Sequence, residues 1–132
     1  MADEAVCIET PTRFARYTVA DGAGIAIGTL LKVGSDPNTA AATGADNDKF
    51  AGIAWEEKTA SDGITEITAA LDGVWDIKSG GGGVTLGALV NVGGANIVNT
   101  AASGDMDAGS IVGRALETGA AAEVIRVRVF NI

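Results

Sequence analysis

The chain has 132 residues, of which 47% are apolar but only 5% aromatic, and it carries seventeen acidic against nine basic residues. This length is typical of one domain, whose core must be built mainly from small and aliphatic side chains. A formal net charge of −8 disfavours direct binding to nucleic acid or to an anionic membrane surface. The single cysteine excludes an intrachain disulfide, so we expect synthesis and folding in a cytoplasm.

The N-terminal segment, residues 1–12, shows no hydrophobic period and contains a proline that would interrupt a central strand. It lacks the pattern of an export signal, and no stretch of the chain is apolar enough to predict a membrane span. Val6, Cys7 and Ile8 form a short β-prone run within it. Two interpretations stay open: an arm that adds a strand to a neighbouring protein, outside a β-rich domain of residues 13–132, or the first strand of that domain.

Two pairs of segments indicate an internal duplication. Residues 24–33 (GIAIGTLLKV) align without gaps with residues 83–92 (GVTLGALVNV) at an offset of 59, and residues 51–57 align with residues 112–118 at an offset of 61. Self-similarity at a nearly fixed offset is typical of repeated structural units. Convergent strand and turn patterning in a glycine-rich chain is the alternative. The duplication predicts that Gly28 and Gly87 occupy equivalent positions.

The glycine run Gly80–Gly83 raises the question of a phosphate-binding loop. A P-loop requires Lys followed by Ser or Thr at the start of a helix, whereas Val84 and Thr85 follow here and favour a strand. Because Gly83 aligns with Gly24, we predict that the run is a turn leading into the second copy of the aligned strand.

Several segments have the pattern of strands. Residues 123–130 alternate strictly, with Ile125, Val127 and Val129 on one face and arginines on the other. Residues 63–75 predict a second strand region with a bulge at Asp72-Gly73. Residues 24–33 predict one continuous strand with apolar residues on both faces, namely Ile25, Ile27 and Leu31 on one and Ala26 and Leu30 on the other. Such a strand is typical of a barrel interior or a subunit contact.

These patterns predict an all-β fold. We expect a compact single domain that resembles a barrel or a sandwich, with few or no short helices and with the internal duplication described above.

The sequence offers little for catalysis. It contains no histidine, which removes the usual general base and the commonest metal ligand, and Cys7 has no base beside it in the sequence. The acidic pairs Asp46 with Asp48 and Asp105 with Asp107 do not fit the spacing of a calcium loop, so they predict polar turns. We therefore expect no enzyme, no metal site and no cofactor.

Trp55 and Trp75 are two of only six aromatic residues, and each precedes an acidic residue. They are candidates for the core, for a subunit interface or for a stacked ligand, and the sequence does not separate these interpretations.

Four segments, in this order, carry a resemblance to a known family: RYTVADGAGIAIGTLLKVG, FAGIAWEEKTASDGITEITAALDGVWDI, VTLGALVNV and GSIVGRALETGAAAEVIRVRV. Together they resemble the small phage-head decoration, or capsid cement, proteins over most of the chain, from Arg13 to Val129. The order of the segments, rather than any single motif, carries the resemblance. It implies a compact β-rich fold, trimers at three-fold and quasi-three-fold positions on an expanded head, and no catalytic residues.

The resemblance implies that the chain binds the major capsid protein on the outer surface of the phage head as a homotrimer. There it would stabilise the head against the pressure of packaged DNA. The alternative function is that of a non-catalytic carbohydrate- or peptide-binding β-module of a phage tail or surface structure. A third class of function is an enzyme subunit that is completed by another chain. For the first interpretation, the candidate capsid or subunit contacts are Val6, Cys7, Ile8, Trp55 and Trp75.

Overall fold

The structure, a computed structural model, describes residues 3–130, which contain eleven strands and one short helix. The first lobe consists of β2 (Phe14–Thr18), β3 (Leu30–Val33), β4 (Ala40–Ala42), β5 (Phe50–Ala54) and β6 (Glu66–Ala70). The second lobe consists of β7 (Gly73–Ser79), β8 (Leu89–Gly94), β9 (Ile97–Thr100), the helix α1 (Asp105–Ala108), β10 (Ile111–Ala115) and β11 (Val124–Val129). Strand β1 (Val6–Glu9) precedes both lobes. The all-β prediction is confirmed.

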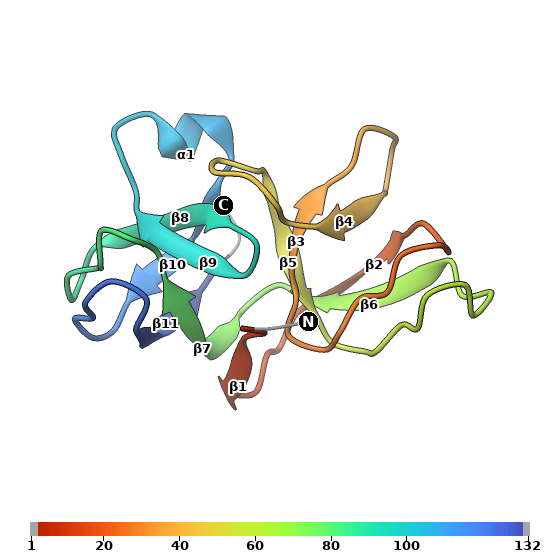
Figure 1. The fold of residues 1–132 in the computed structure, drawn as a ribbon, viewed down its shortest axis with the longest axis horizontal. Helices are drawn as coiled ribbons and strands as arrows, with labels where there is room; N and C mark the ends of the chain where they lie inside the picture. Colours follow the sequence, from red (N-terminus) through yellow and green to blue (C-terminus); the bar gives the residue numbers. More distant parts are fainter. Residues whose placement is uncertain (1–2, 131–132) are drawn as a thin grey trace.

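The two lobes lie side by side and share one topology (Figure 1). Their strands are hydrogen-bonded in the orders β2-β6-β5-β3-β4 and β7-β11-β10-β8-β9, so each strand has a counterpart with the same neighbours. Parallel pairing of β7 with β9 closes the second lobe into a five-stranded barrel. In the first lobe, a single parallel bridge between Thr18 and Thr39 joins the equivalent edges. This shared topology confirms the internal duplication.

Backbone hydrogen bonds repeat between the lobes as well. The amide of Gly28 donates to the carbonyl of Ala54 at 2.9 Å, and the amide of Gly87 donates to the carbonyl of Ala115 at the same distance. Both glycines have a positive φ, +91° for Gly28 and +88° for Gly87. The two glycines therefore occupy equivalent positions, as the aligned sequences predict.

The predicted continuous strands over residues 24–33 and 83–92 are wrong. In each segment an isolated bridge is followed by a turn, and regular pairing begins only at Leu30 and Leu89. The positive φ of the glycine in each turn changes the direction of the chain. As a result Ile27 and Leu86, at the tips of the two turns, are 53% and 61% exposed instead of lining a buried face.

Residues 63–75 also differ from the prediction, because they form two strands instead of one bulged strand. Strand β6 ends at Ala70 and belongs to the first lobe, whereas β7 begins at Gly73 and belongs to the second. The expected bulge at Asp72-Gly73 is thus the junction between the lobes, where Gly73 has a φ of +101°. By contrast, β11 alternates exposed and buried residues as predicted.

The run Gly80–Gly83 is a turn at the end of β7, as predicted. Gly81 and Gly82 are exposed, Gly83 has a φ of +69°, and Val84 forms the bridge that matches the one at Ile25 in the first lobe. The run therefore turns the chain between β7 and the second copy of the duplicated segment, which begins at Gly83.

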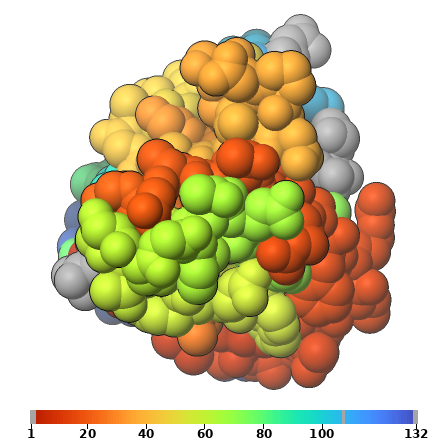
Figure 2. Space-filling model, turned by 90° about the vertical axis from the view of Figure 1, so that its right-hand side faces the viewer, coloured from red at the N-terminus to blue at the C-terminus, as the bar shows by residue number. Residues whose placement is uncertain are grey.

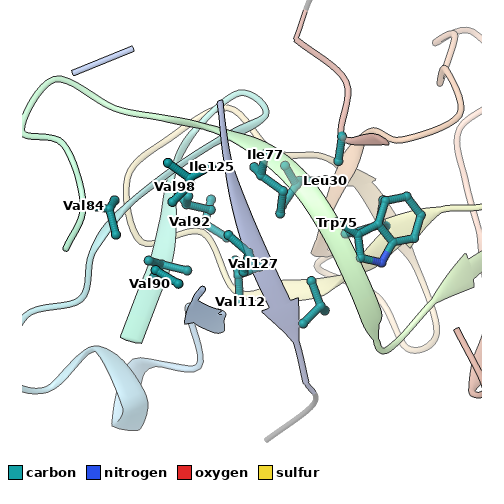
Figure 3. Close-up of a cluster of buried hydrophobic side chains, with 14 of the residues drawn as sticks. Leu30, Trp75, Ile77, Val84, Val90, Val92, Val98, Val112, Ile125 and Val127 are labelled. Atoms are coloured by element: carbon teal, nitrogen blue, oxygen red, sulfur yellow. The ribbon is translucent and has the colours of Figure 1, made fainter. Parts of the chain in front are cut away.

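Each lobe has its own buried cluster. The interior of the first lobe is formed by small and aliphatic side chains, including Leu31, Ala54 and Ile67. The second cluster is larger and contains Trp75, Ile77 and the buried valines of β8 to β11 (Figure 3). Three residues of the first lobe belong to this second cluster, namely Leu30, Ile53 and Ala70. The hydrophobic contact between the lobes is therefore continuous with the core of the second lobe.

A buried lysine joins two loops of the first lobe. Lys58 Nζ lies 3.1 Å from an Asp21 carboxylate oxygen and 2.9 Å from an Asp62 carboxylate oxygen, and it also donates to the carbonyls of Asp21 and Thr59. Burial alone would lower the pKa of Lys58, but the hydrogen bonds to Asp62 and Asp21 outweigh it and raise the pKa. This lysine stays charged inside the fold because oxygen acceptors surround it.

Candidate functional site

The N-terminal run lies in an edge strand of its own chain. Strand β1 pairs antiparallel with β7, with Val6 opposite Asp76 and Cys7 opposite Trp75, and among residues 3–130 it pairs with no other strand. Within the described chain the run therefore belongs to the sheet of the second lobe. Ile8 lies at the irregular step in the register between Cys7 and Glu9.

From Val6 to Ile8, the side chains of this edge strand point alternately to solvent and to the core. Val6 and Ile8 are exposed, whereas Cys7 is half-buried and packs against the core of the second lobe. Burial raises the pKa of the Cys7 thiol, so its reactive thiolate form is disfavoured. The edge strand thus presents two apolar side chains and an unpaired backbone edge to its surroundings.

The stretch from Ala5 to Arg13 is fixed to the body of the protein at both of its ends. At one end the Ala5 amide donates to the Gly28 carbonyl at 2.8 Å. At the other end the Asp72 carboxylate accepts hydrogen bonds from the Thr12 amide at 2.8 Å, the Thr12 hydroxyl at 2.7 Å and the Arg13 amide at 3.2 Å. Burial alone would raise the pKa of Asp72, but these hydrogen bonds outweigh it and lower the pKa.

The two tryptophans lie in different environments. Trp75 is 1% exposed, and its indole Nε1 donates to the Asp72 carbonyl at 3.0 Å, so it is a core residue that presents no surface to a partner. Trp55 is 36% exposed and packs edge-on against Trp75 with ring centroids 6.0 Å apart. Phe14 adds a third ring, 5.5 Å from that of Trp55, and it is also exposed. A line of aromatic rings therefore runs from the core to the surface.

Exposed apolar residues outside the five contact candidates include Phe14 and the two turn-tip residues Ile27 and Leu86. A signal for the last two was present, because a glycine follows each of them at equivalent places in the duplicated segments. No comparable signal marked Phe14. Figure 2 shows the surface of the first lobe, where residues of the N-terminal half of the chain cover most of the visible face.

Some of the charged side chains on the outer faces are paired locally. Arg16 lies 3.4 Å from both Glu56 and Glu66 in the first lobe, and Arg126 lies 3.2 Å from Asp76 in the second. These exposed pairs contribute little to stability, on the order of 0 to 1 kcal/mol each. Five of the nine basic residues form no ion pair within residues 3–130, namely Arg13, Lys32, Lys49, Arg114 and Arg128.

The described residues offer no assembled chemical centre. No group of three or more Cys, Asp or Glu side chains in the described part of the chain is placed to hold a metal ion. The polar turn predicted at Asp46 and Asp48 is present, since the Asp48 carboxylate accepts the amides of Gly44 and Ala45 at 2.8 and 3.0 Å. The turn predicted at Asp105 and Asp107 is wrong, because these residues lie in the short helix α1. No helix within residues 3–130 is long and apolar enough to cross a membrane.

Comparison with known proteins yields a likeness of fold. No protein-family model matches the chain, and no curated protein matches its sequence. Among solved structures, the fold is similar to that of the N base of the head fiber protein gp8.5 of bacteriophage phi29, with a TM-score of 0.57 and 12% sequence identity. The similarity covers 91% of this chain and 98% of that chain. Both lobes therefore take part in the shared fold.

Proposed function

We propose that this chain is a non-catalytic structural protein of a bacteriophage head, which binds the outer surface of the expanded head as a homotrimer and stabilises it. The observation that carries the proposal is the fold, which matches that of a phage head fiber base over 91% of the chain. The sequence resemblance to capsid decoration proteins points to the same structural class.

The surface suits a role in attachment. The exposed side chains of Val6, Ile8 and Trp55 are apolar groups that a partner protein can cover, and β1 leaves one backbone edge unpaired. The net charge of −8 requires that the capsid surface in contact with the chain be neutral or basic. Three linked contacts of a trimer would give firm attachment even where each contact is weak.

Co-sedimentation tests the proposal directly. The purified protein should sediment with expanded heads of the source phage but not with proheads, and native mass spectrometry should show a trimer. A protein that binds neither form of the head refutes the role in the head.

Contact variants locate the attachment surface. The double change Val6→Ser with Ile8→Ser should weaken head binding, and so should Trp55→Ala. Val33→Ser is the matched control, because Val33 is also an exposed valine of a strand but lies outside β1 and the aromatic line. Equal binding by all four proteins, wild type included, would place the attachment surface elsewhere.

A second candidate function has one observation in its favour. The neighbouring rings of Phe14 and Trp55 are both partly exposed, which suits stacking against a sugar or a peptide side chain in a tail or surface module. Titration with oligosaccharides and peptides, followed by tryptophan fluorescence, distinguishes the two functions. Saturable quenching that Trp55→Phe abolishes, without any binding to heads, would favour the binding module.

A further inference from the structure

Each lobe carries a row of three cross-strand partners at the same place on its outer surface. In the first lobe the row crosses β3, β5 and β6 and consists of Leu30, Ile53 and Ala70. In the second lobe it crosses β8, β10 and β11 and consists of Leu89, Arg114 and Arg128. We refer to these sets as the first row and the arginine row. The duplication makes them equivalent positions in two related lobes.

The first row is an interface within the chain. All three of its residues are fully buried, although they point away from the interior of their own lobe. They pack into the hydrophobic cluster of the second lobe, and the Leu30 amide also donates to the Asn96 side-chain oxygen at 2.9 Å. This position on a lobe is thus one that a neighbouring lobe covers.

The arginine row has no such cover in the single chain. Arg114 and Arg128 are exposed and lie directly opposite each other, an arrangement that destabilises a sheet when the charges are alike. Arg114 donates to the Gly87 carbonyl at 2.7 Å, whereas Arg128 makes no ion pair or side-chain hydrogen bond with any residue in the range 3–130. Arg126, on the same strand, is neutralised by Asp76. An anionic group from outside the chain would relieve the repulsion.

We propose that the arginine row binds carboxylates of a second copy of this chain. The inference rests on the proposed homotrimer and names its contact. A chain with seventeen acidic against nine basic residues presents an excess of carboxylates to its neighbour, and exposed ones without an ion pair among the described residues include Glu9 and Asp36. The guanidinium group is suited to them, because its fork of N–H donors matches the two oxygens of a carboxylate.

The charge of the row also determines the symmetry of the contact. Two arginine rows repel each other, so this surface cannot meet its own copy across a two-fold axis. The contact is therefore heterologous, joining the arginine row of one copy to a different surface of the next, and such contacts form a closed ring where the rotation between copies closes. A ring of three copies satisfies both this geometry and the proposed trimer.

The test compares two double variants that lose the same charge. Arg114→Gln with Arg128→Gln removes the arginine row, and Arg13→Gln with Arg16→Gln removes two exposed arginines of the first lobe as the control. Native mass spectrometry and sedimentation equilibrium should show that the first variant associates at least about tenfold more weakly than wild type and the control. Its melting temperature as a monomer should equal or exceed that of wild-type monomer, because like charges are removed.

The outcomes separate this inference from the proposed function. A wild-type trimer that dissociates in the arginine-row variant, but not in the control variant, supports the inference even if wild type fails to bind heads. A trimer of unchanged strength in that variant overturns it, and so does a variant trimer that no longer binds heads, because the row would then contact the capsid. A wild-type monomer that sediments with heads overturns it too and leaves the role in the head standing.

Discussion

Alanine substitution at the two equivalent glycines separates backbone strain from the contact that holds the N-terminal segment. Gly28 and Gly87 share the same φ and the same hydrogen bond to the end of the neighbouring strand. They differ in their surroundings. A Cβ at Gly28 would overlap the carbonyl oxygen of Ala5 and lie 3.1 Å from its amide nitrogen, whereas nothing lies within 4 Å of a Cβ at Gly87.

The expected costs follow from this difference. An alanine forced into a positive φ costs about 1 to 2 kcal/mol, and this applies to both positions. At Gly28 the Ala5 backbone must also move away, which breaks its 2.8 Å hydrogen bond to the Gly28 carbonyl at a cost of about 1 kcal/mol. Exposure of the buried Ala5 methyl group adds less than about 1 kcal/mol to this cost. Gly28→Ala should therefore be less stable than Gly87→Ala by about 1 to 2 kcal/mol.

Urea unfolding followed by circular dichroism measures this difference, and thermal unfolding should place the two melting temperatures about 4 to 8 °C apart. Hydrogen exchange provides a local readout: the amides of Val6–Glu9 should exchange faster in Gly28→Ala than in Gly87→Ala. If the two variants lose the same stability within about 0.5 kcal/mol, the contact between Ala5 and Gly28 does not hold the N-terminal segment and the reasoning is refuted.

Trp75→Ala should lower the free energy of unfolding by about 3 to 5 kcal/mol, because it removes a buried ring. Trp55→Ala removes a partly exposed ring and should lower it by less than half as much. Equal losses in urea unfolding would contradict the assignment of Trp75 to the core. Lys58→Met should lower the melting temperature because it removes the donor to two carboxylates and two carbonyls, while Lys49→Met, at an exposed lysine, should barely change it. Because the pKa of Asp72 is depressed in the folded protein, its contribution is fully present above about pH 4 and lost as the pH falls through the folded pKa. Asp72→Asn should therefore flatten the acid dependence of unfolding, and a curve that is unchanged by the substitution would exclude this role.

Part of the fold could be predicted from the sequence because the relevant signals are local. The strict alternation in residues 124–129 specifies one buried and one exposed face, and β11 has both. The duplication was visible because the lobes keep nearly the same spacing between the turn glycine and the residue that accepts its hydrogen bond, 26 residues from Gly28 to Ala54 and 28 residues from Gly87 to Ala115. The turn at the Gly80–Gly83 run followed from that alignment.

Other features depend on contacts between distant residues. The apolar run around Gly28 has the composition of a strand, but Gly28 lies in a turn, and its amide donates to the carbonyl of the distant Ala54. Likewise, Leu71 and Asp72 do not reveal by themselves that the strands on either side of them belong to different lobes. For the candidate site, the sequence selected Val6, Ile8 and Trp55, which are exposed. It did not separate them from the buried Trp75, because exposure depends on which lobe covers each side chain.

The position of β1 has a consequence for the order in which the molecule is built. This strand leaves the ribosome before the other ten strands, yet its partner β7 begins at Gly73, after the whole of the first lobe. During synthesis the first lobe can complete its own sheet while β1 has no strand to pair with, and its apolar residues stay uncovered until β7 emerges. Along the sequence, the first lobe lies between these two paired strands. A chain that is truncated before β7 therefore has a β1 strand without a partner, and such an unpaired strand is prone to aggregation.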